Sequence, residues 1–433
     1  MVNRNEQVAV FGLGFVGLPL ALSFAMRGTK VVGVDIDTKL IKELSQGITH
    51  HLEAYQGETI QDILQKQINN GKFQAIADPS YALEQCSSYI VTVGIPVVEG
   101  TGYMGHLESV SKTIAKGLKK GDLVVIRSTV VPGTVRNFIQ PILEESGLKA
   151  GIDFHLGYAS ERIAEGKAFD EFENMPTLVS GVNEASAKAT EALLKIVTKA
   201  EIVIASSIEV VETSKVLENL SRDINIAMVN EFARFTKEMG IDIFEVIQVA
   251  NTHKRVNLLY PGPGVGGYCI PNAFYYLKPK ADDLNIDLKL SATAREINSD
   301  TPNRIARMAI GKLTVPASEA KICILGMAMK DYSSDDRMSP ALDVIKNLQT
   351  QGVKVSVYDP AIPQNHDYLT DTIEEALKDA HGIIVLAKQE GIDFGDLDKF
   401  KALMCADKPF IIDTRNVYKK DRIEAAGFVF EGL

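Results

Sequence analysis

The first third of the chain alternates short apolar runs with apolar stretches at helical spacing. Residues 8–11 and 30–34 are β-rich runs, and 18–26 between them has the pattern of a buried helix. Residues 89–93 and 123–126 have the composition of buried parallel strands. Strands that alternate with helices predict a parallel, doubly wound sheet.

The middle of the chain has a helical pattern instead. Residues 209–239 contain no proline or glycine and repeat apolar positions at helical spacing, which predicts one long helix that ends at Gly240. A second helix is expected over 243–250. Residues 260–271 hold four glycines and three prolines, and this composition predicts a loop.

The last part returns to α/β alternation, with expected strands at 321–325, 354–358, 382–386 and 409–412. At roughly 100–200 residues per domain, 433 residues suggest two or three domains. The predicted fold class is α/β: two Rossmann-like doubly wound domains joined by a long central helix and a helical middle domain. The expected boundaries are 1–205, 206–305 and 306–433.

Composition and charge narrow the classes of function. The net charge of −10 argues against a nucleic-acid-binding protein. No run of 18 apolar residues predicts a membrane span, and the polar start of the chain does not resemble a signal peptide. The cysteines are far apart and form no metal-ligand pattern, so we expect no metal and a reducing, cytoplasmic location. They are Cys86, Cys269, Cys323 and Cys405.

The first expected turn carries a dinucleotide-binding pattern. Gly12, Gly14 and Gly17 follow a strand and precede a helix, and Asp35 ends the next strand 18 residues after the last glycine. Glycines permit the tight turn and the approach of a pyrophosphate to a helix N-terminus, where Phe15 and Val16 also lie. The Asp35 carboxylate suits ribose hydroxyls and repels a 2′-phosphate, which favours NAD over NADP. A glycine turn for another ligand is the alternative.

The second α/β region has no such pattern. Its first strand ends at Gly326, but the following residues, Met327, Ala328 and Met329, lack the spaced glycines. We therefore expect that this turn does not bind a dinucleotide.

Cys269 is the candidate nucleophile. Small glycine neighbours allow a substrate carbon to approach sulfur, and a nearby cation or helix terminus stabilises a thiolate. Lys215 and Asn219 lie four residues apart on the expected long helix and share a face. Together they could hydrogen-bond a developing alkoxide. The alternative is an inert cysteine and a solvated Lys–Asn pair.

Taken together, these motifs resemble the UDP-glucose/GDP-mannose dehydrogenase family over nearly the whole chain, from Val8 to about Arg415. The matching stretches are 12–17 (GLGFVG), 128–134 (STVVPGT), 160–168 (SERIAEGKA), 212–219, the cysteine loop and 330–340. Residues 219–230, and 253–257 (HKRVN) leading into 261–267 (PGPGVGG), are most similar to the branch that oxidises UDP-N-acetylhexosamines, particularly UDP-N-acetylmannosamine.

The resemblance implies an NAD-dependent oxidation of a UDP-hexose at C6 to a UDP-uronic acid. Cys269 would hold the thiohemiacetal and thioester, Lys215 and Asn219 would stabilise the oxyanions, and Thr129 and Glu161 would position water or assist proton transfer. The first domain would bind NAD, the long helix would form a homodimer or part of a higher oligomer, and the last domain would bind the UDP-sugar. Thr129 and Lys330 would also contact the cofactor. The implied substrate-binding residues are Glu161, Arg162, Lys215, Asn219, Arg255 (reaching the partner's site), Tyr260, Gly264, Gly266, Lys330 and Arg337.

The sequence departs from the family at two positions. Ala273 stands where the family places an aspartate, four residues after the cysteine, and Tyr268 stands where the N-acetylhexosamine branch has histidine. A methyl group cannot activate water, so a two-electron enzyme that releases a carbonyl sugar is an alternative. Another NAD enzyme, such as a β-hydroxyacid dehydrogenase, and a non-catalytic binder of NAD or a nucleotide sugar are further alternatives.

Overall fold

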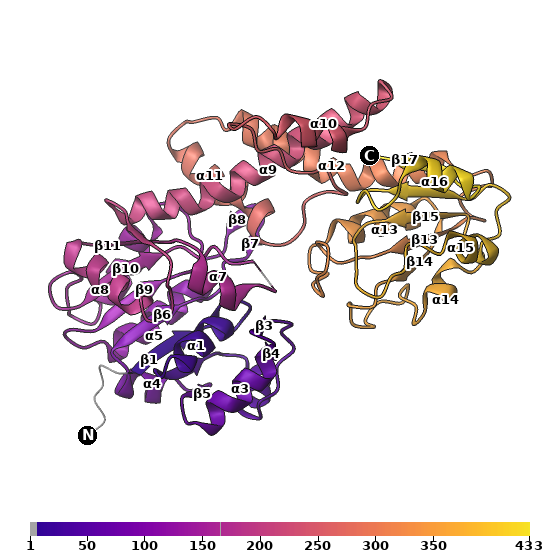
Figure 1. Ribbon diagram of the computed structural model, residues 1–433. Helices are drawn as coiled ribbons and strands as arrows, with labels where there is room; N and C mark the ends of the chain where they lie inside the picture. The colour runs from indigo at the N-terminus through magenta and orange to yellow at the C-terminus, as the bar shows by residue number, and fades with distance from the viewer. Residues whose placement is uncertain (1–6, 165) are drawn as a thin grey trace. The chain divides into compact units, whose positions relative to one another are not determined.

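The computed structural model describes residues 7–164 and 166–433 (Figure 1). It separates into two compact units. One comprises Met1–Glu218 and Tyr275–Ile286, and the other comprises Asn219–Phe274 and Asp287–Leu433. Two of the unit boundaries fall inside the long helix α9 (Ile208–Glu238) and inside α11 (Cys269–Asp283), and the third falls between Ile286 and Asp287, after α11. The division at 205 and 305 stays a prediction.

The first unit is built on an eight-stranded sheet with the order β12-β11-β10-β9-β6-β1-β2-β5. Its strands are β1 (Gln7–Phe11), β2 (Lys30–Val34), β5 (Phe73–Ile76), β6 (Ser88–Val91), β9 (Leu123–Ile126), β10 (His155–Ala159), β11 (Thr177–Gly181) and β12 (Ile202–Ile204). All neighbouring pairs are parallel except β10 and β11, which are antiparallel. The predicted doubly wound sheet is therefore mainly parallel, with this one antiparallel pair.

Helices cover both faces of this sheet. The helices are α1 (Gly17–Met26), α2 (Thr38–Ser45), α3 (Ile60–Asn69), α4 (Ser80–Gln85), α5 (Gly105–Gly117), the π-helical turn η2 (Val135–Ile139), α6 (Gln140–Glu144), α7 (Ala168–Asn174) and α8 (Glu184–Leu194). Val8 and Val10 of β1 join one apolar core with α1, α3 and α7. Ala9 and Phe11 are buried on the opposite face, as the two-residue period of a strand requires. Two short hairpins, β3 (Ala54–Tyr55) with β4 (Glu58–Thr59) and β7 (Val97–Val98) with β8 (Thr101–Gly102), complete the unit.

The second unit combines helices with a five-stranded parallel sheet of order β14-β13-β15-β16-β17. Its strands are β13 (Lys321–Leu325), β14 (Lys354–Tyr358), β15 (Gly382–Val385), β16 (Phe410–Asp413) and β17 (Val429–Gly432). Its complete helices are α10 (Ile243–Ala250), α12 (Lys289–Gly311), α13 (Pro340–Thr350), α14 (Ile373–Leu377), α15 (Leu397–Leu403) and α16 (Lys420–Ala425). Ile322 and Ile324 point into one core, and Cys323 and Leu325 point into the other.

Most predicted elements are confirmed. The helix expected at 209–239 is α9, the next is α10, and β2, β9, β13 and β14 have the expected bounds. Two expectations are wrong. The strand at 89–93 ends at Val91, and the loop expected over 260–271 ends earlier, because α11 begins at Cys269. Pro271 lies in the first turn of that helix, where a missing backbone N–H costs no hydrogen bond.

Within residues 7–164 and 166–433, no helix is both long and apolar enough to cross a bilayer.

Candidate active site

The glycine turn after β1 has the geometry that its sequence predicts. Gly12 has φ +92°, which favours glycine. A Cβ on Gly17 would lie 1.8 Å from the Gly12 carbonyl oxygen, so only glycine fits there. A Cβ on Gly14 would have no atom of the described chain within 4 Å, so the backbone at this position is open to a ligand.

The surroundings of this turn also fit a dinucleotide. Among the described residues, no side chain caps the N-terminus of α1, which leaves this end available to an anionic group. The Asp35 carboxylate is half-buried and accepts hydrogen bonds from Leu13 N (2.7 Å) and Asp37 N (3.0 Å), so it also fixes the glycine turn. Phe15 is 39% exposed beside the turn, and its ring lies 4.9 Å from the His51 ring.

Strand register places further predicted residues at the same edge of the sheet. Phe11 pairs with Val34 and Val91, and Ile126 pairs with Val91 and Tyr158. The carboxyl ends of these parallel strands are therefore aligned, and ligands of such sheets bind at this edge. Thr129, which is partly buried, follows β9, and Glu161 follows β10.

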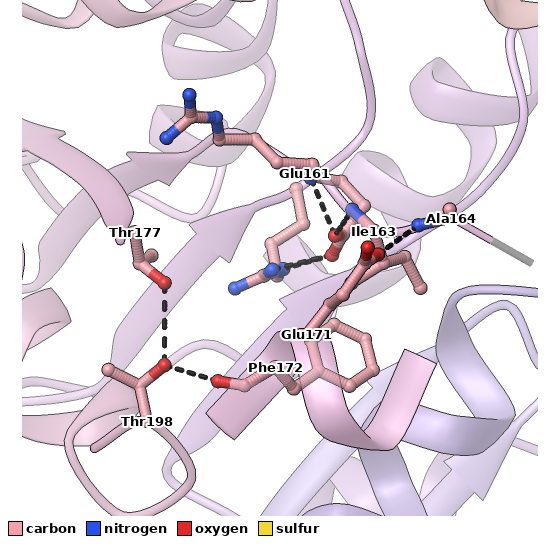
Figure 2. A network of polar contacts seen from close by, with 9 residues as sticks. Glu161, Ile163, Ala164, Glu171, Phe172, Thr177 and Thr198 are labelled. Atoms are coloured by element: carbon pink, nitrogen blue, oxygen red, sulfur yellow. Dashed lines mark hydrogen bonds and ion pairs between the residues drawn. The ribbon is translucent and has the colours of Figure 1, made fainter. Parts of the chain in front are cut away.

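Glu161 is held by four donors (Figure 2). Its Oε2 accepts from Nε and Nη2 of Arg127, at 3.2 and 2.5 Å. Its Oε1 accepts from the backbone N–H groups of Arg162 and Ile163, at 2.6 and 2.8 Å. Arg127 is 4% exposed and has its guanidinium 5.6 Å from the centre of the Phe172 ring. Sequence reasoning missed Arg127, although a basic residue directly after β9 was a usable signal.

The side chain of Arg162 has its own partners in this structure. It forms an ion pair with Glu218 at 2.9 Å and donates to the Pro176 carbonyl oxygen at 2.9 Å. Its backbone, rather than its guanidinium, contacts the carboxylate of Glu161.

The long helix α9 carries three buried polar residues of one sequence motif. Glu212 accepts hydrogen bonds from Gly133 N (2.5 Å) and Val135 N (2.9 Å), so it ties α9 to the loop after Thr129. Burial raises the pKa of Glu212 to about 7. Lys215 is 6% exposed and Asn219 is 1% exposed. Asn219 accepts from Arg222 at 2.7 Å, but its Nδ2 has no hydrogen-bond partner within the described chain.

In the second unit, the glycine-rich loop ends at the exposed Cys269, the first residue of α11. The backbone of this loop packs against the segment before α13. Gly267 N donates to the Met338 carbonyl oxygen at 3.3 Å, and a Cβ on Gly266 would lie 2.7 Å from Pro340 Cδ. Gly264 has φ +133°. The loop before the cysteine is therefore fixed by close backbone contacts that larger residues would prevent.

Arg337 lies beside this loop. It pairs with both carboxylate oxygens of Asp335, at 2.8 and 2.7 Å, and its guanidinium is 5.6 Å from the centre of the Tyr268 ring. Tyr268 is the residue that replaces the expected histidine. It directly precedes Cys269, so its contact with Arg337 places that guanidinium near the cysteine loop. Lys330 is half-buried on the same segment.

Other predicted substrate residues are more exposed. Arg255 is exposed in the loop after α10, and Tyr260 is 53% exposed and stacks on Phe244 with ring centres 5.8 Å apart. Ala273 is buried at 1% exposure one helical turn after Cys269, and Asn272 beside it is 3% exposed. The position of the expected aspartate is thus an apolar one.

Three sequence profiles of one family match this chain. They are the NAD binding domain at residues 6–200, the central domain at 209–300 and the UDP binding domain at 323–420 of the UDP-glucose/GDP-mannose dehydrogenase family. The chain belongs to this family. The resemblance inferred from the motifs is confirmed, and the NAD binding domain establishes NAD as the cofactor.

Individual relatives match along nearly the whole chain. A UDP-N-acetyl-D-mannosamine dehydrogenase of Pyrococcus horikoshii is 34% identical over 430 residues, which cover 99% of each chain. A UDP-N-acetyl-D-glucosamine 6-dehydrogenase of Pseudomonas aeruginosa is 33% identical over 89% of this chain and 90% of its own. A solved UDP-D-ManNAc dehydrogenase structure from Pyrococcus horikoshii has a TM-score of 0.90 at 33% identity and covers 98% of each chain. The predicted α/β fold class with a helical middle is confirmed.

Proposed function

We propose that this dehydrogenase oxidises the C6 hydroxyl of UDP-N-acetylmannosamine, or of the epimer UDP-N-acetylglucosamine, to the UDP-uronic acid. The similarity to relatives named for these two sugars supports the substrate class. The observation that carries the chemistry is the exposed Cys269 at the start of α11, after a loop whose glycines fix its backbone by close contacts. The site residues inferred from the sequence remain proposals.

We assign the cofactor to the turn at Gly12, Gly14 and Gly17, with Asp35 facing the adenosine ribose. When bound, NAD accepts one hydride in each of the two oxidations. Thr129 follows β9 at the same edge of the sheet as this turn, so its hydroxyl can contact the nicotinamide side of the site.

The protein's own part in the reaction centres on sulfur. The first oxidation removes a hydride from C6 and a proton from its hydroxyl, and gives an aldehyde. The Cys269 thiolate adds to the aldehyde carbon and forms a thiohemiacetal, whose alkoxide is a suitable target for Lys215 and Asn219. Loss of a second hydride gives a thioester, and attack by water releases the carboxylate and the thiol. A sulfur-bound intermediate prevents escape of the aldehyde between the two oxidations.

The buried methyl of Ala273 favours a second candidate function, in which the enzyme stops after one oxidation. The side chain one turn after Cys269 cannot accept a proton from water, and the Glu161 carboxylate already accepts four hydrogen bonds. Loss of a general base typically slows a step by about 10²–10⁴-fold. The product would then be a carbonyl sugar, or a thioester that remains on the enzyme.

The test is to count NADH formed per sugar consumed, with limiting UDP-N-acetylmannosamine, UDP-N-acetylglucosamine and UDP-glucose compared in parallel. Two NADH per sugar support the full oxidation, and one supports the second candidate. The Cys269→Ser variant should lose the second oxidation while retaining NAD binding. Absence of NADH with all three sugars contradicts the proposal.

We also propose a homodimer through the second half of α9. Met228, Phe232, Phe235 and Met239 recur at spacings of four, three and four residues, so they form one stripe on the helix, and each is at least 39% exposed. An exposed apolar stripe of this kind is typical of a protein–protein interface. Light scattering after gel filtration should give twice 47.3 kDa. The double change Phe232→Asp and Phe235→Asp should give the monomer mass, whereas Glu238→Gln on the same helix should not.

A further inference from the structure

Arg127 is a buried cation that the proposed chemistry does not use. It follows β9 directly, its backbone N–H donates to the Val91 carbonyl oxygen at 2.8 Å, and its side chain is 4% exposed. A buried charge is costly unless it is paired and hydrogen-bonded. Its partner is Glu161, one of the residues assigned to the reaction, and the Phe172 ring covers its guanidinium. The Phe172 backbone is fixed in turn, because the Thr198 hydroxyl donates to its carbonyl oxygen (Figure 2).

We propose that Arg127 is a positioning residue that fixes the direction of the Glu161 carboxylate and supplies its buried counter-ion. The proposal rests on the proposed function, because it assigns Arg127 a role only through Glu161. Both donor atoms that Arg127 directs to a carboxylate, Nε and Nη2, point to Glu161. The adjoining cavity, lined by Arg127, Ser160, Glu161 and Phe172 among others, measures about 10 Å³, which is water-sized.

The hydrogen-bond pattern shows what the pairing achieves. Arg127 occupies only Oε2 of Glu161, so Oε1 is left to the backbone N–H groups of Arg162 and Ile163. One carboxylate thereby joins the end of β9 to the loop after β10. The loop after β10 starts at the same edge of the sheet as Thr129, which follows β9. A shift of Glu161 would therefore move the backbone of residues 161–163 at that edge.

The other charged and titratable groups around Glu161 do not replace Arg127. Arg162 directs its guanidinium to Glu218 and to the Pro176 carbonyl oxygen. Glu171 accepts from the Ala164 N–H and carries a further negative charge in the same cavity lining. Burial raises the pKa of Tyr158, so this side chain stays neutral. In the absence of Arg127, Oε2 of Glu161 would therefore lose both of its donors, and the buried carboxylate would lose its counter-ion.

The activity test compares the wild type with Arg127→Met, Arg127→Lys, Glu161→Gln and the double variant Arg127→Met/Glu161→Gln. For Arg127→Met we expect kcat at pH 7 to fall on the order of 100-fold. The acid limb of its pH profile should move to higher pH, because removal of the cation beside a buried carboxylate disfavours the charged form. Arg127→Lys keeps the charge and should restore most of kcat. In the Glu161→Gln background, Arg127→Met should add little, since the two residues act together.

An unmoved acid limb, or a full multiplicative loss in the Glu161→Gln background, would overturn the proposal and leave Arg127 a structural residue. A failure of Arg127→Lys to restore kcat would also count against it, because charge would then not be what matters.

A second test does not depend on turnover. The loss of Tm caused by Arg127→Met should grow as pH rises from about 5 to 8, since an unpaired buried Glu161 destabilises the fold only when ionised. The same change in the Glu161→Gln background should cause a loss that is constant with pH. If the wild type oxidises none of the sugars, the proposed function fails, whereas this comparison still decides whether Arg127 is the counter-ion on which Glu161 depends. A pH-independent loss in both backgrounds would refute that coupling.

Discussion

The turns after β1 and β13 share a framework but differ in what can reach them. Gly12 (φ +92°) and Gly326 (φ +76°) each follow the first strand of a parallel sheet. In each turn, a carboxylate at the end of the next strand accepts a backbone N–H: Asp35 accepts from Leu13, and Asp359 accepts from Met327, both at 2.7 Å. The backbone support of a dinucleotide-type turn is thus present twice.

The difference lies in the residues that follow each glycine. The backbone at Gly14 is open, and Asp35 is half-buried. In the second turn, Met327 and Ala328 are buried at 0% and 3% exposure, and Asp359 is 1% exposed and also accepts from Gln389 at 3.1 Å. The turn after Gly326 is therefore filled by its own side chains. A shared backbone framework is therefore not enough for a turn to bind a dinucleotide, because open space above the turn is also required.

The largest expected effect comes from filling the first turn. Gly17→Ala places a methyl group against the Gly12 carbonyl oxygen, which forces the turn apart. We expect NAD affinity to fall by about 100-fold or more, measured by calorimetric titration. Met327→Gly in the second turn is the matched change, and it should create no second NAD site. A second NAD equivalent bound by Met327→Gly would show that the Met327 side chain alone closes the second turn, without the buried Ala328 and Asp359.

A third carboxylate that accepts backbone N–H groups, Glu212, tests how burial affects such a contact. Its pKa is raised from the ordinary value to about 7 by burial, so the folded state binds the proton more tightly than the unfolded state. Stability is therefore greatest below about pH 4.5 and declines as pH rises through 7. The upper limit of the loss is about 3 kcal/mol.

Glu212→Gln cannot ionise, so its stability should lack this decline. Urea unfolding at several pH values for both proteins measures the difference. Equal slopes with pH for wild type and variant would show that folding does not change the pKa of Glu212.

Asp359 provides the stability counterpart of Asp35. Asp359→Ala leaves the buried N–H groups of Met327 and Ala328 without their acceptor, and we expect a loss of about 2 kcal/mol with NAD affinity unchanged. Asp35→Ala should weaken NAD binding about tenfold with a smaller loss of stability, because its site is half-exposed. Thermal unfolding and NAD titration of both variants check the pair. Weaker NAD binding by Asp359→Ala would show that the second turn influences the first.

The sequence was informative where one local pattern decides the outcome. The steric need for glycine at Gly12 and Gly17, the uninterrupted helical spacing of α9 and the buried runs of β2 and β13 are local properties, and each was predicted. Arg127 was not, because its importance depends on the pairing of β9 with β10, which brings it to Glu161 from 34 residues away. The helical start of α11 was missed because the glycines and prolines before Cys269 dominated the local composition. A proline in a first helical turn gives no contrary signal.

The smallest effect in this series concerns what the second unit binds in place of a dinucleotide. Arg337 is 2.8 and 2.7 Å from the two oxygens of Asp335 and lies over the Tyr268 ring, so its guanidinium is fixed in direction. A fixed guanidinium suits a phosphate of the nucleotide sugar. Arg337→Met should raise the KM for the UDP-sugar about tenfold, or about 1.4 kcal/mol, and leave the NAD affinity and the Tm nearly unchanged.

Tyr268→Phe keeps the ring and should behave as the wild type, whereas Tyr268→Ala should give part of the Arg337→Met effect because the guanidinium loses its support. Steady-state kinetics with each substrate varied in turn separates these outcomes. If Arg337→Met weakens the binding of NAD and of the sugar equally, the division of ligands between the two units is wrong. If only the binding of the sugar is weakened, the second unit binds its ligand through the loop that carries Arg337, and not through the filled turn after Gly326.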